Sequence, residues 1–329
     1  DMIVEIFMQA YEIDYELTPA EVSEKVDTLL EGPFAVLKPR QQEIENEILS
    51  RITVRVGAAT ALADDDDHVD WLPDVDRSQW RLWLRLDRHL RRQGKLAPAV
   101  LRELDQSTDR VLGKLESPER EPRWDRRGMV VGHVQSGKTT HYTALAAKAL
   151  DAGYQIVIIL AGIHKSLRSQ THERIDQQLI GRDSAALLEA TRSKQNDADV
   201  KFIGVGRESV EFGDPQTPFS ILTCTTSDEQ GDFNTKIATQ VGLQPSAGSR
   251  LVMVVKKNAT ILRNLTNWLR SQNTLPGVGG QERRISAPAL VIDDEADHAS
   301  VNTARDIDAD PTTINRLIRG LLISFERVG

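Results

Sequence analysis

The feature that most constrains this chain is a run of glycine, lysine and threonine between an apolar stretch and a helical pattern. Residues 132–139 read Gly-His-Val-Gln-Ser-Gly-Lys-Thr, which fits the spacing G-x-x-x-x-G-K-[ST]. Gly132 and Gly137 allow backbone angles that a side chain would forbid, so successive N–H groups can surround a phosphate. We expect residues 128–131 to end a strand and residues 140–150 to form a helix whose N-terminus faces the anion.

The predicted phosphate-binding loop assigns particular roles to its residues. Lys138 is expected to reach the β- and γ-phosphates of ATP, and the Thr139 hydroxyl is expected to bind Mg²⁺. A chance match is the alternative, and the strand and helix patterns on both sides of the loop disfavour it. The expected ATP-binding residues are Gly132, His133, Val134, Gln135, Ser136, Gly137, Lys138, Thr139 and Thr140.

An acidic run directly after an apolar stretch supplies the second half of the expected site. Residues 289–292 are apolar, and residues 293–297 read Asp-Asp-Glu-Ala-Asp. An acid at the end of a buried strand can hold Mg²⁺ opposite Thr139, and we assign this role to Asp294, with Asp293 as the alternative. Glu295 is expected to orient and deprotonate the attacking water, which favours hydrolysis over phosphoryl transfer. Taken alone, the run could also be an acidic surface loop.

Composition is that of a globular protein and excludes several classes. Of the 329 residues, 40% are hydrophobic and 27% are charged. The formal net charge of −8 argues against a protein coated with nucleic acid, although a local basic patch could still contact phosphates. A single cysteine, Cys224, excludes an internal disulfide, and no apolar run approaches the ~20 residues of a membrane span. We therefore expect a cytoplasmic protein without a membrane partner, and its oligomeric state stays open.

Two regions of different pattern divide the chain. Residues 1–117 carry helix signals and are predicted to form a helical N-terminal domain. From residue 118 to residue 329, strands alternate with helices, which is typical of an α/β lobe with a mostly parallel sheet. An insertion with little regular structure is expected at about 206–250, where only residues 219–224 depart from the polar composition. The expected strands lie at 128–131, 155–160, 201–205, 251–255, 289–292 and 321–325.

These motifs together resemble a known group of proteins. The glycine-lysine loop with Asp294-Glu295-Ala296-Asp297 resembles motifs I and II of superfamily-two helicases and translocases. Residues 130–139 look like the GxVQSGKT form of the bacterial Z-one-domain family, whose members are often described as endonucleases. Further similar stretches lie at 152–154, 160–162, 167–171 and 255–258. The resemblance implies a RecA-like ATPase lobe of an anti-phage or restriction system, dependent on ATP and Mg²⁺.

The resemblance also implies contacts with nucleic acid. In superfamily-two motors, the turns after two of the strands grip the nucleic-acid backbone, which suits cations beside helix N-termini. Packing or ion pairing inside the protein is the alternative for the cations. The implied partners are nucleic acid, with DNA preferred, and other defence proteins such as a nuclease. The residues so implied are Lys165, Arg168, Gln170, Lys256 and Lys257.

One departure from the resembled group limits these expectations. A complete motor has a second lobe that supplies an arginine finger, and the chain stops at Gly329 before such a lobe. We expect it to be part of a longer protein and to hydrolyse ATP slowly by itself, because an arginine finger contributes ~10³ to 10⁵ in rate. A nucleotide-controlled switch or scaffold, which assembles partner proteins without moving on DNA, is the alternative function.

Overall fold

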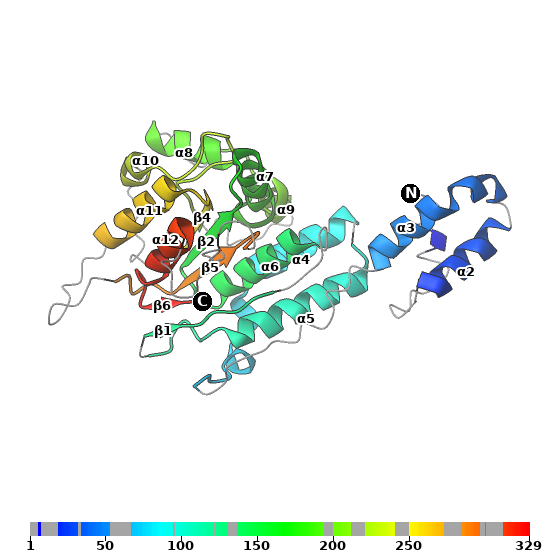
Figure 1. Cartoon of the computed structure of the whole chain (residues 1–329), viewed down its shortest axis with the longest axis horizontal. Helices are drawn as coiled ribbons and strands as arrows, with labels where there is room; N and C mark the ends of the chain where they lie inside the picture. Colours follow the sequence, from blue (N-terminus) through cyan, green and yellow to red (C-terminus); the bar gives the residue numbers. More distant parts are fainter. Residues whose placement is uncertain are drawn as a thin grey trace.

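The chain folds as an α/β protein around one parallel sheet (Figure 1). No helix of the described part is both long enough and apolar enough to span a membrane. A computed structural model describes residues 6–7, 19–31, 34–52, 67–94, 96–121, 123–130, 137–193, 200–211, 221–240, 250–272, 284–296, 300 and 312–329.

The sheet has six strands in the order β1-β6-β5-β2-β4-β3, and all neighbouring strands are parallel. β2 is central and pairs along its length with β4 and β5, and all its side chains are buried, as expected for a strand covered on both faces. The predicted strands at 155–160, 251–255 and 289–292 are confirmed. The bounds are Trp124–Asp125 (β1), Ile156–Ala161 (β2), Ile221–Leu222 (β3), Arg250–Lys256 (β4), Ala289–Asp293 (β5) and Arg327–Val328 (β6).

The strand predicted at 128–131 is wrong where the structure describes it. Residues 128–130 are exposed and lie outside the sheet, and β1 comes earlier in the chain. Trp124 and Asp125 are the residues that pair with β6, opposite Arg327 and Val328, so the paired segment precedes the expected one. The backbone N–H of Arg126 still donates to the Val328 carbonyl at 2.9 Å, and regular pairing ends there.

Three other expectations about the second half of the chain are also wrong. In place of a strand at 201–205, the chain forms one bridge through Phe202 and then enters helix α9 (Gly204–Glu211). Residues 321–325 begin as the end of helix α12 (Thr313–Leu322), and the strand follows as β6. In the described part of 206–250, α9 continues to Glu211 and α10 (Thr235–Gln240) follows β3, so this part is more regular than predicted. Short apolar runs fit helix and strand equally well, which explains the two misplaced strands.

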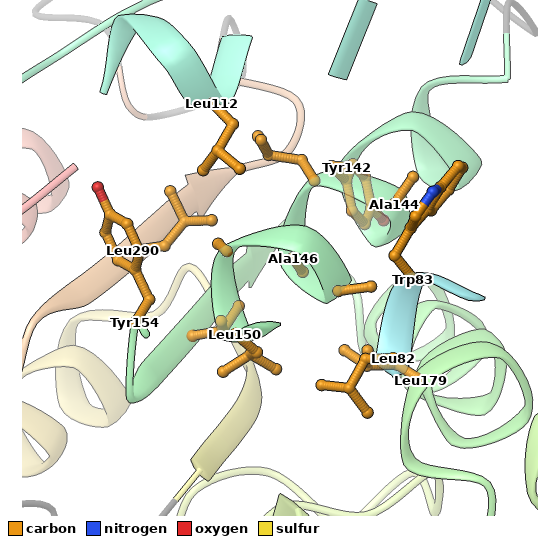
Figure 2. Close-up of a cluster of buried hydrophobic side chains, with 14 of the residues drawn as sticks. Leu82, Trp83, Leu112, Tyr142, Ala144, Ala146, Leu150, Tyr154, Leu179 and Leu290 are labelled. Atoms are coloured by element: carbon orange, nitrogen blue, oxygen red, sulfur yellow. The ribbon is translucent and has the colours of Figure 1, made fainter. Parts of the chain in front are cut away.

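Two hydrophobic clusters cover the two faces of the sheet. Alternate β2 residues point into each, with Val157 and Ile159 in the first and Ile156 and Ile158 in the second. The first cluster contains α4 (Leu82–Gln93), α5 (Pro98–Lys114) and α6 (Lys138–Asp151). The second contains α11 (Ala259–Ser271) and α12. Figure 2 shows the first cluster around α6, with side chains from α4, α5, α6 and β5 directed toward one another.

The helices predicted in the first third of the chain are present. Helices α2 (Pro19–Leu30) and α3 (Gln41–Ile52) pack on each other through their own small cluster, which includes Val22, Leu30 and Ile48. Helices α4 and α5 instead share their core with α6 and the sheet. The expected boundary after residue 117 therefore follows α5, a helix whose apolar side chains belong to the core of the sheet.

Candidate functional site

Several expected site residues of the described part follow strand ends at the carboxyl edge of the sheet, where ligands bind in open parallel sheets. Asp293 ends β5 opposite Leu160 of β2, and Ala161 of β2 lies opposite Lys256 of β4. The residues that follow these three adjacent strands are therefore neighbours in space. They include the acidic run after β5, Gly162 after β2 and Lys257 after β4.

The described end of the glycine-lysine loop begins helix α6. Gly137 caps this helix with φ 75° and ψ 19°, a left-handed conformation that glycine adopts without strain. Lys138 is the first helical residue and is exposed, and Thr139 and Thr140 are half-buried. Free backbone N–H groups at such a helix start suit an anion. The other loop positions, Gly132, His133, Val134, Gln135 and Ser136, lie outside the described residues.

Tyr142 joins the start of α6 to the acidic run. Its hydroxyl donates to Asp294 Oδ2 at 3.1 Å, which ties helix α6 to the turn after β5. The neighbouring side chains of Thr139 and Thr171 lower the pKa of this hydroxyl, but by less than other groups raise it. Burial, and then the charge of Asp294, raise the pKa of Tyr142 well above its ordinary value, so the group stays a neutral donor. Asp294 is thus held against helix α6, on which Thr139 precedes Tyr142 by three residues.

The two adjacent acids Asp293 and Asp294 have different partners. Asp293 Oδ1 accepts a hydrogen bond from Lys257 Nζ at 2.8 Å, so its charge compensates a buried lysine. Asp294 instead faces Tyr142 on α6. The sequence left the two acids as alternatives, and in the fold Asp294 is the one that accepts a hydrogen bond from helix α6, through Tyr142.

Glu295 has an unusual backbone. Its φ is 55°, and it is the one non-glycine residue at positive φ among the described residues. Such a conformation costs of order 1–3 kcal/mol and is found mainly where the surroundings enforce it, often at functional sites. The exposed carboxylate lies beside Gly162, since a Cβ built on that glycine would be 2.9 Å from Glu295 Oε2. The absence of a side chain at Gly162 therefore leaves room for the carboxylate.

Two of the expected nucleic-acid contacts point into the protein. The side chain of Lys257 is fully buried against the β5 turn. Arg168, on α7 (Lys165–Ile175), is also fully buried, and its guanidinium donates to the carbonyls of Thr226 at 2.7 Å and of Asp228. Both side chains pack and form polar contacts inside the protein, which is the alternative to a nucleic-acid contact. Neither is therefore accessible to a nucleic-acid backbone in this conformation.

The other three expected contacts lie nearer the surface. Lys165 and Gln170 are exposed on α7, and Lys256 is half-buried at the end of β4. Lys165 and Gln170 lie on the helix that follows β2, and Lys256 is the last residue of β4.

Sequence reasoning missed three residues of the site. Tyr142 follows Thr139 by three residues in a predicted helix, so helical spacing could have placed both on one face. Thr171 lies in a segment that the family resemblance covered, but its effect on the pKa of Tyr142 depends on how α7 packs. Gly162 lies in the stretch 160–162 that the family resemblance covered, but its importance comes from the position of Glu295 in the turn after β5, which the local sequence does not show.

No protein-family model, no curated protein and no solved structure matches the chain. The fold and site by themselves define a broad class. It is an α/β protein with a parallel sheet, whose candidate site at the carboxyl edge brings a helix start, a hydroxyl and carboxylates together.

Proposed function

We propose that this chain is the ATP-binding and ATP-hydrolysing lobe of a motor that acts on nucleic acid in a bacterial anti-phage or restriction system. The observation that carries the proposal is the hydrogen bond from the Tyr142 hydroxyl to Asp294, which brings the acidic turn after β5 to helix α6, the helix that begins at Gly137 with Lys138 and Thr139. The parallel sheet supports a RecA-like lobe. The motor and its defence setting come from the resemblance of the motifs to the Z-one-domain family.

The donor set fits Mg²⁺ and a nucleotide. Magnesium in nucleotide sites takes one or two carboxylates, a hydroxyl and phosphate oxygens rather than a cage of protein ligands. Thr139 and Asp294 supply the first two, and among the described residues no three His, Cys, Asp or Glu side chains form a larger metal cluster. When bound, Mg²⁺ neutralises charge on the β- and γ-phosphates.

The side chains of the site then take distinct roles. Lys138 and the N–H groups at the start of α6 hold phosphate charge. Glu295 accepts the proton of the attacking water, because its carboxylate is exposed and its backbone is fixed by the turn after β5. The Tyr142 hydroxyl donates a hydrogen bond to Asp294 and so orients this carboxylate. The tyrosine itself stays neutral, because its pKa is raised.

Two substitutions in the full chain test these roles. Lys138→Ala is expected to weaken MgATP binding roughly 30- to 100-fold, the value of a charge-assisted contact with phosphate. Glu295→Gln is expected to leave binding unchanged and to lower hydrolysis about 10²- to 10⁴-fold, since only proton transfer is lost. Equilibrium binding and phosphate release measure the two effects, and Lys236→Ala on the exposed face of α10 serves as the control. If Lys138→Ala bound MgATP as tightly as the wild type, the proposed nucleotide site would be contradicted.

A switch or scaffold is the second candidate function, and the inward positions of Arg168 and Lys257 favour it. Because these two side chains are buried, only three of the five residues expected to contact the nucleic-acid backbone lie nearer the surface. DNA added to the ATPase assay separates the two functions, because a motor predicts stimulation that falls steeply as salt rises. A switch predicts hydrolysis that is independent of DNA at every salt concentration.

A further inference from the structure

Lys257 occupies a buried position that the proposed reaction does not use. Its side chain is fully buried after β4, and its ammonium donates to the Asp293 carboxylate at 2.8 Å. It also donates to the carbonyl oxygens of Asp294 at 2.7 Å and Glu295 at 2.6 Å, with the Ser300 hydroxyl at 3.2 Å. An ammonium has three protons, so these acceptors saturate it, and Asp293 compensates its charge. The group is therefore held in one place.

The backbone of Lys257 contacts the other side of the site. Its N–H donates to the carbonyl of Gly162 at 3.0 Å, in the turn that follows β2. Gly162 is also the residue beside which the Glu295 carboxylate lies. Lys257 thus binds the β2 turn through its backbone and the β5 turn through its side chain, and Glu295 lies between these two contacts.

The two carbonyl groups that Lys257 holds belong to the peptide planes on either side of the Glu295 Cα. Rotation of the first plane sets φ of Glu295, and rotation of the second sets its ψ. A glutamate at φ 55° is disfavoured unless its surroundings fix it in place. An ammonium that bonds both carbonyls fixes both angles at once. This contact accounts for a left-handed glutamate without a glycine.

We propose that Lys257 is a positioning residue that locks the backbone of Glu295 and so keeps its carboxylate beside Gly162. The role of that carboxylate in water activation rests on the proposed function. The mechanical part, which is the locking of the turn after β5, stands on the contacts alone. It predicts that loss of the ammonium loosens this turn while the rest of the sheet keeps its structure.

Hydrogen exchange of the full chain, followed by mass spectrometry, tests the locking without any nucleotide. In Lys257→Met, amide exchange at 293–296 is expected to rise about tenfold or more, as for a turn that loses charge-assisted hydrogen bonds. The Asp294 amide, which donates to the Leu160 carbonyl at 3.1 Å, reports this directly. Amide exchange along β2 is expected to stay as in the wild type. Lys256→Met is the matched control, since its side chain takes no part in these contacts.

A second variant protects the test from a failure to fold. The double variant Asp293→Asn with Lys257→Met removes both charges of the ion pair and leaves no uncompensated carboxylate. It is expected to keep the fold and to show the same faster exchange at 293–296. Exchange at wild-type rates in either folded variant would overturn the locking role.

Kinetics separate positioning from a merely structural role. In single-turnover hydrolysis of MgATP, Lys257→Met is expected to lower the rate about tenfold and to change the dissociation constant by less than about twofold. In a Glu295→Gln background the same substitution is expected to cost nothing further, because Lys257 acts through Glu295. An equal loss in both backgrounds would contradict the role. If the wild type bound no nucleotide, the proposed function would be wrong. The hydrogen-exchange result would then still test whether Lys257 locks the turn after β5.

Discussion

Tyr142 and Gly162 set the positions of the two carboxylates that face the candidate site. The tyrosine is buried and neutral, and its hydrogen bond holds Asp294 against helix α6. The glycine contributes through what it lacks, because a side chain there would meet Glu295 Oε2 at 2.9 Å and Leu167 Cδ2 at 2.7 Å. At this scale the site depends on one hydroxyl and one missing methyl group.

Gly162→Ala is expected to lower ATP hydrolysis about tenfold or more and to leave nucleotide affinity unchanged. The new methyl group displaces the Glu295 carboxylate, and a shift of 1 Å in a reacting group can cost up to about 10²-fold in rate. Both crowded atoms end flexible side chains, so the fold remains. Single-turnover hydrolysis and thermal melting measure the two effects.

The control for this substitution is Gly320→Ala, in α12, where an added Cβ meets nothing within 4 Å. It is expected to keep the wild-type rate and to gain up to about 1 kcal/mol of stability from better helix propensity. Hydrolysis at the wild-type rate by Gly162→Ala would show that Glu295 does not act from its position beside this glycine.

Among the helices, Lys148 on α6 contacts α4 and α5 and so helps to position α6. Its side chain is fully buried, and the ammonium donates to Asp105 Oδ1 at 2.5 Å and to Asp109 Oδ1 at 2.6 Å on α5. It also lies 4.4 Å from the centroid of the Trp83 ring on α4, a favourable cation–π distance. Helix α6, which begins with Lys138 and Thr139, is therefore anchored to α4 and α5 by a charged contact as well as by the apolar core.

Lys148→Met is expected to lower the free energy of unfolding by about 2 kcal/mol. Removal of one partner from a buried ion pair can cost ~3–5 kcal/mol, but water can solvate Asp105, whose side chain is 45% exposed. Urea denaturation measures the loss. Lys236→Met, on the exposed face of α10, is expected to change stability by less than about 0.5 kcal/mol. Equal losses in the two variants would show that the contact does not stabilise the helices.

The elements that sequence predicts well are those with a strong local pattern. The apolar runs that become β2, β4 and β5 are recognisable as strands from the sequence alone. In contrast, β1 and β6 have two residues each and form because distant segments pair. The same distinction holds in the site. Lys138, Asp294 and Glu295 follow from motif spacing, but the burial of Arg168 and Lys257 does not, because their acceptors come from other turns of the fold.

For the whole molecule, the strand order decides how the two halves of the site meet. β6 lies between β1 and β5, so the strand that precedes the glycine-lysine loop is not adjacent to the strand that carries the acids. Helix α6 connects them instead, because it packs on β2 and β5 and its tyrosine contacts Asp294 (Figure 1). The shared core of α4, α5, α6 and the sheet holds this arrangement before any ligand binds.

The central claim, that Thr139 and Asp294 serve one magnesium-nucleotide site, is tested most directly by a double-mutant cycle on ATP affinity. Thr139→Ala and Asp294→Asn are measured singly and together, with Mg²⁺ and with a chelator. We predict about tenfold weaker binding for each single variant in Mg²⁺, a double variant hardly weaker than either, and no effect of any variant without the metal. Losses that simply add, or that persist in the chelator, would contradict a shared magnesium site.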